Sequence, residues 1–168
     1  MTSFQNKPCY FAYGSNMNPA RMRARGLHFV HAEAALLRGY ALRFNKHSHS
    51  CPGVAYANVV AATGGGVEGV LYTLSDDAEL DKMDVFEGTP VRYSRERMLV
   101  DTAAGAVATW IYVANPAFVC AGLLPEDRYL AHLLAGAEFL SPSYLQWLGE
   151  QPCQPAAESG KCGLLYND

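Results

Sequence analysis

The sequence is poor in charged residues. It contains 13 Lys and Arg against 16 Asp and Glu, so only 17% of the 168 residues are charged and the formal net charge is −3. A surface that binds nucleic acid needs clustered Lys and Arg side chains. No such cluster and no run of like charges is present. We therefore expect no nucleic-acid partner and no charged tail that binds another protein.

Long apolar runs are also lacking. No segment has the charged and apolar parts of a signal peptide, and none approaches the roughly 20 apolar residues of a membrane span. The five cysteines include no Cys-x-x-Cys pair, and their number is odd. This usage predicts reduced thiols, a cytoplasmic location and no membrane partner. A local bridge between Cys153 and Cys162 would require an oxidising compartment.

No linker or internal repeat divides the chain. Half of the residues are hydrophobic, which suits one compact domain with a sizeable core. We assign residues 1–149 to this domain. Residues 150–168 are rich in Gln, Pro, Gly and Ser and are typical of an extended C-terminal tail.

The common nucleotide and nucleophile motifs are absent as well. There is no Gly-x-Gly-x-x-Gly spacing, no P-loop, and no Gly-x-Ser-x-Gly around Ser15. What is present is Cys9-Tyr10-Phe11-Ala12-Tyr13-Gly14-Ser15-Asn16-Met17-Asn18-Pro19. It predicts a buried strand, a turn at Gly14 whose backbone angles suit glycine, and a helix capped by Asn18 with Pro19 at its first position. This arrangement either binds an anion with its backbone N–H groups or is an ordinary strand-to-helix turn.

The whole chain predicts about six strands and three or four helices. Strands are expected at 28–30, 36–44, 54–62, 67–74, 91–100 and 107–114, with glycines 64–66 forming a hairpin turn between two of them. Helices are expected at 19–25, from a Ser75 cap to residue 87, at 127–139 and at 144–148.

Two further clusters of side chains have a chemical and an ordinary interpretation. Arg21, Arg23 and Arg25 follow the glycine turn and either approach an anion there or form a solvated helix face, which we favour slightly. His47, His49 and Cys51 alternate and could hold a metal ion. A polar loop is the stronger interpretation of that segment, because no further ligand cluster is visible.

Glu87 occupies an unfavourable position for a carboxylate. It precedes Gly88 and Pro90, which end the expected helix. A carboxylate at a helix C-terminus is destabilised by the partial negative charge of the last carbonyl groups, and this raises its pKa toward that of a general base. The alternative is an exposed glutamate that tolerates a small energetic cost.

Two segments together resemble a known family. Tyr13-Gly14-Ser15-Asn16-Met17, after Tyr10-Phe11-Ala12, is similar to the N-terminal signature of the gamma-glutamylcyclotransferase-like family, with Met17 in place of the more usual leucine. Asp84-Val85-Phe86-Glu87-Gly88, followed by Tyr93, resembles its second signature. The resemblance spans about residues 10–148 and implies an α+β fold, a small mixed β-barrel with flanking helices.

The resemblance also implies a reaction and a site. The α-amine of a gamma-glutamyl compound attacks its own γ-carbonyl, which forms 5-oxoproline and releases an amine or amino acid. Glu87 corresponds to the proton-transfer group, and no metal or organic cofactor is needed. The implied substrate contacts are Tyr10, Phe11, Ala12, Tyr13, Gly14, Ser15, Asn16, Tyr93 and Tyr129.

The sequence leaves several questions open. Backbone amides of residues 14–16 either stabilise the oxyanion or hold the substrate α-carboxylate. The implied partner is a small gamma-glutamyl molecule, but its leaving group is not specified, and the protein is a monomer or a homodimer. An amidase of the same fold and a binding protein without turnover are the alternatives to a cyclotransferase.

Overall fold

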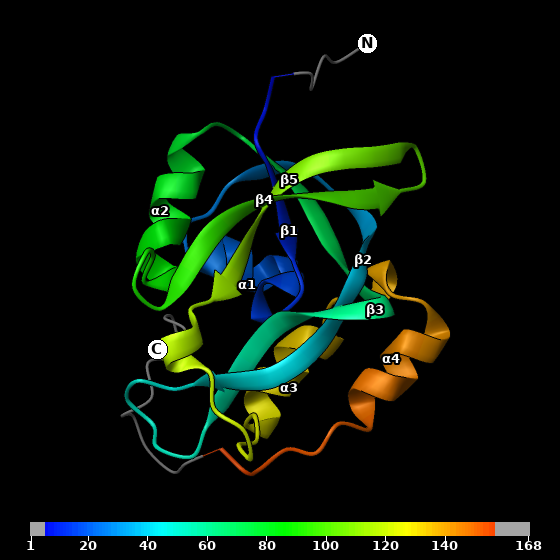
Figure 1. Cartoon of the computed structure of the whole chain (residues 1–168). Helices are drawn as coiled ribbons and strands as arrows, with labels where there is room; N and C mark the ends of the chain where they lie inside the picture. The colour runs from blue at the N-terminus through cyan, green and yellow to red at the C-terminus, as the bar shows by residue number, and fades with distance from the viewer. Residues whose placement is uncertain (1–5, 157–168) are drawn as a thin grey trace.

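The computed structural model of the chain describes residues 6–156 and contains a closed barrel of five strands, where about six were expected. Figure 1 shows the barrel with helices at its sides. The order around the barrel is β1-β3-β2-β4-β5, and β1 closes it by pairing in parallel with β5. The other named pairs are antiparallel. The strands are β1 (Cys9–Ala12), β2 (Phe29–His47), β3 (Ala55–Leu74), β4 (Tyr93–Thr102) and β5 (Gly105–Ala114). The prediction of a small mixed barrel is therefore confirmed.

The strand count falls short because β2 and β3 are long and continuous. Each was expected as two separate strands, and the hairpin turn predicted at 64–66 does not exist. Instead, β2 and β3 stay paired through this segment, and their register shifts there. Arg38 lies opposite Gly66, whereas Tyr40 lies opposite Ala61, so the paired strands contain a bulge. A side chain at Gly65 would start 2.5 Å from the carbonyl oxygen of Tyr40. The glycines thus allow the paired strands to bend and their backbones to approach closely. The composition of this segment had suggested a turn.

Within residues 6–156, four α-helices and three short 3₁₀ helices accompany the barrel, and Figure 1 shows them around it. The helices are α1 (Pro19–Ala24), α2 (Ala78–Glu87), α3 (Asp127–Leu134) and α4 (Pro142–Gly149), with η1 (Ser15–Met17), η2 (Pro116–Phe118) and η3 (Ala137–Phe139) between elements. In Figure 1, α2 lies on one side of the barrel and α4 on the other. Helix α3 packs against both η1 and α4.

Two helix boundaries differ from the prediction. Ser75 does not cap α2, because the chain bends at Asp76 and Asp77 first, and the Asp76 carboxylate accepts the Ala78 N–H at 2.9 Å. Helix α3 ends at Leu134, five residues before the expected end. Gly136 follows it, and a side chain there would start 2.9 Å from Cβ of Met17. The end of α3 therefore needs a glycine to pack against η1.

The C-terminal residues that the structure describes pack on the domain. Gln154 bridges to Glu126, donates its backbone N–H to Pro125, and its side chain reaches the carbonyl groups of Gly53 and Leu124. The part of the predicted tail that the structure describes is therefore anchored to the domain. Residues 157–168 of the tail lie outside the described residues. None of the described helices has the length and apolar character to cross a membrane.

The cysteines correct another expectation. Cys9, Cys120 and Cys153 are free thiols, whereas Cys51 is disulfide-bonded. The expectation of five reduced thiols is therefore wrong for Cys51, because an odd cysteine count does not show which side chains meet in space. The compartment stays a prediction.

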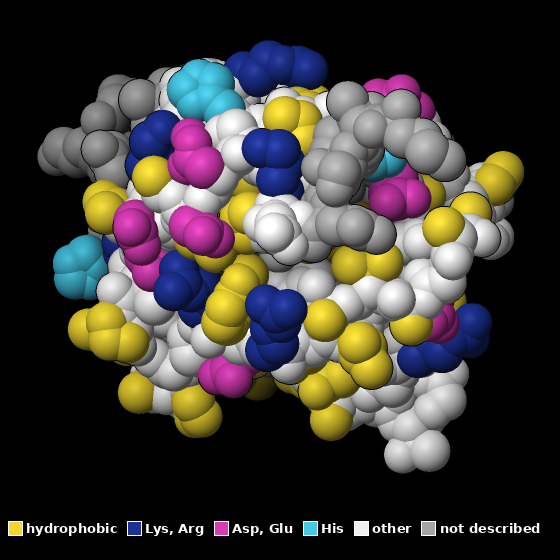
Figure 2. Space-filling view, turned by 90° about the horizontal axis from the view of Figure 1, so that it is seen from above, with side chains coloured by type: hydrophobic (Ala, Val, Ile, Leu, Met, Phe, Trp, Pro, Cys, Tyr) yellow, Lys and Arg dark blue, Asp and Glu magenta, His cyan; other side chains and the backbone are white. Residues whose placement is uncertain are grey.

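In the view of Figure 2, Lys and Arg side chains alternate with Asp and Glu, so this face carries no extended basic patch.

Candidate functional site

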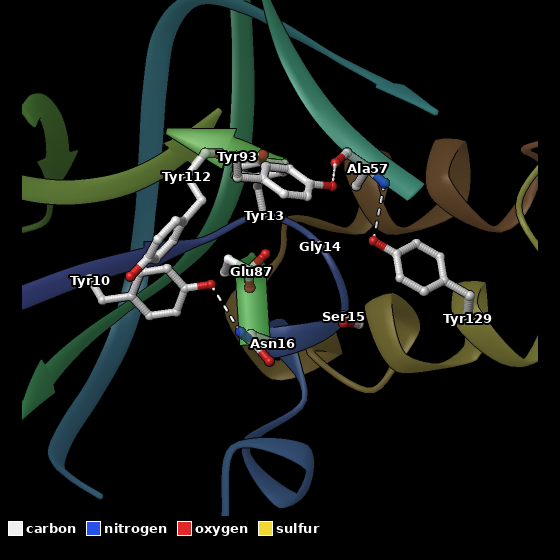
Figure 3. A pocket seen from close by; sticks show the side chains of 10 residues that line it. All are labelled: Tyr10, Tyr13, Gly14, Ser15, Asn16, Ala57, Glu87, Tyr93, Tyr112 and Tyr129. Carbon is white, nitrogen blue, oxygen red and sulfur yellow. Dashed lines mark hydrogen bonds between the residues drawn. The ribbon is translucent and has the colours of Figure 1, made fainter. Parts of the chain in front are cut away.

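One pocket brings together residues from the strands β1, β3, β4 and β5 and from the helices around them (Figure 3). It lies where the end of β1, the beginning of η1, the end of α2 and the helix α3 meet. Its lining residues are Tyr10, Tyr13, Gly14, Ser15, Asn16, Ala57, Glu87, Tyr93, Tyr112 and Tyr129. Five of the ten are tyrosines and one is a carboxylate, so the pocket offers hydroxyl groups around a single negative charge.

Glu87 reaches this pocket from the last position of α2. Its side chain is only 4% exposed, and Figure 3 shows segment 13–16 curving around it. Gly88 ends the helix in the left-handed conformation, with φ 64° and ψ 34°, and Thr89 N–H returns to the carbonyl of Asp84 at 2.9 Å. The sequence prediction of a glutamate at a helix C-terminus is confirmed. The alternative of an exposed glutamate is wrong.

The glycine turn has a different physical basis from the one predicted. Gly14 has φ −112°, outside the left-handed region, so its backbone does not demand glycine. Its Cα is instead crowded: a Cβ atom would lie 3.0 Å from the hydroxyl oxygen of Tyr129 and 3.3 Å from Cβ of Ala57. Gly14 therefore makes room for the Tyr129 hydroxyl. Beyond η1, the Asn18 side chain accepts the Ala20 N–H at 3.0 Å and caps α1, as expected.

The five pocket tyrosines remain neutral hydrogen-bonding groups at physiological pH. Burial raises the pKa of Tyr10, Tyr13 and Tyr93 well above the usual 10, and the negative charge of Glu87 raises it further. The pKa values of Tyr112 and Tyr129 are also raised, chiefly by burial. The pocket wall therefore presents phenols and no phenolates to a ligand.

Arg21 of α1 and Arg25 at the C-cap of α1 donate hydrogen bonds to side chains of the turn after β1. Arg21 donates from Nε to the Ser15 hydroxyl at 3.1 Å, and burial, with the nearby charge of Arg25, lowers the pKa of Arg21 to about 10. Arg25 is 6% exposed and donates to the Asn16 side-chain oxygen at 2.9 Å. Arg23 points elsewhere, over the ring of Phe29. The slightly favoured solvated face is therefore wrong for Arg21 and Arg25.

Most of the sequence-predicted site residues meet in the pocket. Phe11 and Ala12 do not line it, because their side chains are fully buried in the core. The sequence analysis missed Ala57 and Tyr112. Tyr112 lies on the strand expected at 107–114, but both faces of that strand are largely apolar, so no alternation singled it out. Ala57 bonds Tyr129 and Tyr93 through its backbone N–H and carbonyl, which no side-chain pattern reveals.

The histidine-rich loop forms no metal centre in the described part of the chain. His47 stacks on Phe118 with ring centroids 5.3 Å apart. Within residues 6–156 no group of three or more His, Cys, Asp or Glu side chains is arranged to hold a metal ion.

The family model described as "Gamma-glutamyl cyclotransferase, AIG2-like" matches residues 10–132. The chain belongs to this family. The match covers both signature segments and ends in α3, just beyond Tyr129. The resemblance found in the sequence is thereby confirmed.

Solved structures give the same fold. A structure named gamma-glutamyl cyclotransferase is 23% identical, covers 95% of each chain and has a TM-score of 0.76. An uncharacterized protein from Homo sapiens is also 23% identical over 95% of each chain, with a TM-score of 0.77. YkqA from Bacillus subtilis is 26% identical over 89% of this chain and 57% of its own, with a TM-score of 0.72. No curated protein matches the chain.

Proposed function

We propose that this protein is a gamma-glutamyl cyclotransferase that uses Glu87 as its general acid and base. One observation carries the proposal: a glutamate carboxylate, 4% exposed, faces a strand-to-helix turn across a pocket whose other polar side chains are hydroxyl and amide groups. A site that only bound ligand would not require a carboxylate at the destabilised end of a helix.

The substrate supplies the nucleophile in this reaction. The α-amine of the gamma-glutamyl group attacks its γ-carbonyl carbon, a C–N bond forms, and a tetrahedral oxyanion results. Glu87 takes a proton from the attacking amine and returns one to the leaving nitrogen, after which the original amide bond breaks. The attack is intramolecular, so a pocket that holds the bent conformer supplies much of the rate. The products are 5-oxoproline and a free amine or amino acid.

The remaining pocket groups bind and orient the gamma-glutamyl head. The backbone amides of residues 14–16 hold either the oxyanion or the α-carboxylate, and Tyr10, Tyr13, Tyr93 and Tyr129 surround the reacting carbons. Each side chain of the pocket is at most 6% exposed. Such burial limits the access of water, which favours cyclisation over hydrolysis. We propose a small gamma-glutamyl compound as the partner and a cytoplasmic location for the protein.

The test is a panel of gamma-glutamyl amino acids, peptides and amines, incubated with the purified protein and analysed by mass spectrometry. We expect 5-oxoproline from at least one compound and none from the variant Glu87→Gln. Glu79→Gln is the matched control, because Glu79 is the other buried glutamate of α2 and does not line the pocket. It should retain turnover while folded. Free glutamate would instead indicate hydrolysis, and binding without product would indicate the non-catalytic alternative.

A further inference from the structure

The hydroxyl protons of the pocket tyrosines do not all point into the pocket. A phenol has one proton to donate. Tyr13 donates its proton to the carbonyl oxygen of Tyr112 at 2.5 Å, and Tyr93 donates to the carbonyl oxygen of Ala57 at 2.9 Å. Tyr112 donates to the carboxylate of Asp84 at 2.6 Å. These three protons are held by the protein and are unavailable to a ligand.

The hydroxyl groups of Tyr10 and Tyr129 instead accept hydrogen bonds from the protein. The Tyr10 oxygen accepts a hydrogen bond from Nδ2 of Asn16 at 3.1 Å, and the Tyr129 oxygen accepts from the backbone N–H of Ala57 at 3.0 Å. Within the described residues neither hydroxyl donates to a protein acceptor. Each therefore keeps its proton for an acceptor in the pocket.

Arg25 fixes the sense of the Tyr10 bond. A guanidinium group can only donate, so the Asn16 atom 2.9 Å from Nη1 of Arg25 is the amide oxygen. The amide nitrogen of Asn16 then faces Tyr10, and because that nitrogen only donates, the Tyr10 oxygen must accept. The direction of both bonds thus follows from a group that cannot reverse its role.

Further contacts hold the hydrogen-bonded side chains of Arg25, Asn16 and Tyr10 in place. Arg25 lies over the ring of Phe86 at 5.0 Å, next to Glu87 in sequence. The backbone carbonyl of Asn16 accepts the Tyr72 hydroxyl proton at 2.7 Å. The side chains of Arg25, Asn16 and Tyr10 are at most 6% exposed, so water does not compete readily for these bonds.

We propose that Arg25 is a positioning residue that, through Asn16, directs the Tyr10 hydroxyl proton toward the γ-carbonyl oxygen of the substrate. This rests on the cyclotransferase activity proposed above. Negative charge develops on that oxygen as the amine attacks, and a donor that is already oriented stabilises the charge without reorganisation. Arg25 itself does not line the pocket.

The proposal predicts an unusual effect of a conservative change at Asn16. In Asn16→Asp the new carboxylate still accepts from Arg25, but it cannot donate to Tyr10. The Tyr10 hydroxyl must then donate its proton to the carboxylate, away from the substrate. The variant should stay folded, because a guanidinium–carboxylate pair replaces a guanidinium–amide bond, and yet lose catalytic rate.

The experiment compares Tyr10→Phe, Asn16→Asp, the double variant, Arg25→Gln and Arg25→Lys, each shown to be folded by thermal unfolding. We expect Tyr10→Phe to lower kcat about 100-fold with little change in KM, the size typical of one oxyanion donor. Asn16→Asp should lower kcat similarly, and the double variant should be no slower than Tyr10→Phe. Arg25→Gln, whose amide can also accept, should lose rate, and Arg25→Lys, a pure donor, should recover part of it.

Several results would overturn the proposal. Losses that multiply in the double variant would mean that the new carboxylate acts directly on the substrate. An effect of Tyr10→Phe on KM alone would place Tyr10 on a part of the substrate that does not change during reaction. The unmodified protein could form lactam, Glu87→Gln could form none, and Tyr10→Phe could keep the kcat of the unmodified protein. This combination would defeat the inference about Tyr10 and leave the proposed function intact.

Discussion

The carboxylate of Asp84 accepts the hydroxyl proton of Tyr112 at 2.6 Å, one helical turn before Glu87 in α2. The second carboxylate oxygen lies 3.0 Å from Nη1 of Arg95, and that guanidinium stacks on Trp110 at 5.0 Å. Helix α2 is thereby attached to β4 and β5 at the level of its last turn. This attachment sets the position from which Glu87 enters the pocket.

Removal of this attachment should lower stability. We expect Asp84→Ala to reduce the free energy of unfolding by about 1–3 kcal/mol, and Tyr112→Phe by about 1 kcal/mol, since each removes a partly buried hydrogen-bond partner. The double variant should lose less than the two single losses together, because the two side chains bond to each other. Urea unfolding of the four proteins measures this coupling. Additive losses would contradict a direct interaction.

A second prediction concerns the crowding at Gly14. In Gly14→Ala the new methyl group would start 3.0 Å from the Tyr129 oxygen, which must shift by a few tenths of an ångström and so disturbs its hydrogen bond with the backbone N–H of Ala57. We expect a higher KM and a stability loss of about 1–3 kcal/mol, the usual cost of overpacking.

Gly149→Ala is the matched control, because Gly149 is helical and has no neighbour closer than 3.9 Å to a new methyl group. It should be neutral or stabilising by up to about 1 kcal/mol. Steady-state kinetics and thermal unfolding of the two variants give the comparison. An unchanged KM in Gly14→Ala would show that the position of the Tyr129 hydroxyl is not needed for substrate binding.

Much of the fold was predictable where one segment carries its own signal. Asn18 and Pro19 mark the start of α1, and Glu87-Gly88 marks the end of α2, because capping depends on neighbours in sequence. The glycines at 64–66 misled the prediction. Their composition suits a turn or a bulge equally, and only the pairing of β3 with β2 along its length decides between the two.

The site was predictable to the extent that its residues lie in the two signatures. Arg25 was assigned to a solvated helix face because an arginine in a short helix is usually solvated, and its burial depends on the distant Phe86 and Asn16. The direction of each tyrosine hydroxyl depends on long-range partners too: Tyr93 on Ala57, and Tyr13 on Tyr112. Sequence spacing contains no information on such contacts.

A third prediction follows from the buried glutamate at the other end of α2. Burial alone would raise the pKa of Glu79, but hydrogen bonds from Lys82 and from the backbone and ring of His28 outweigh it and lower the pKa below the usual 4.5. A lowered carboxyl pKa contributes stability above pH 4.5 that is lost as the pH falls through the folded-state pKa.

Glu79→Gln should therefore lower the free energy of unfolding at neutral pH, by about 1–3 kcal/mol, and flatten its acid dependence. Urea unfolding at pH values from neutral to acid measures both effects. Equal acid slopes in the variant and the unmodified protein would show that Glu79 does not contribute to acid sensitivity.

The last prediction concerns alkaline pH. The phenols of Tyr10, Tyr13 and Tyr93 have a pKa well above 10 in the folded protein, because burial and then the charges around them disfavour phenolate. Below pH 10 they are neutral in both states. Above it they ionise in the unfolded chain and stay protonated in the folded one, so each lowers the free energy of unfolding by about 1.4 kcal/mol per pH unit.

Tyrosinate from these residues should therefore appear only as the protein unfolds. Tyrosinate absorbance and far-ultraviolet circular dichroism, recorded on the same alkaline titration, should show coincident transitions for this group. Tyr10→Phe removes one of the ionising groups and should make the alkaline loss of stability less steep. If all tyrosines ionised while the circular dichroism stayed native, the pocket phenols would be accessible to solvent, and their role as neutral donors around Glu87 would have to be abandoned.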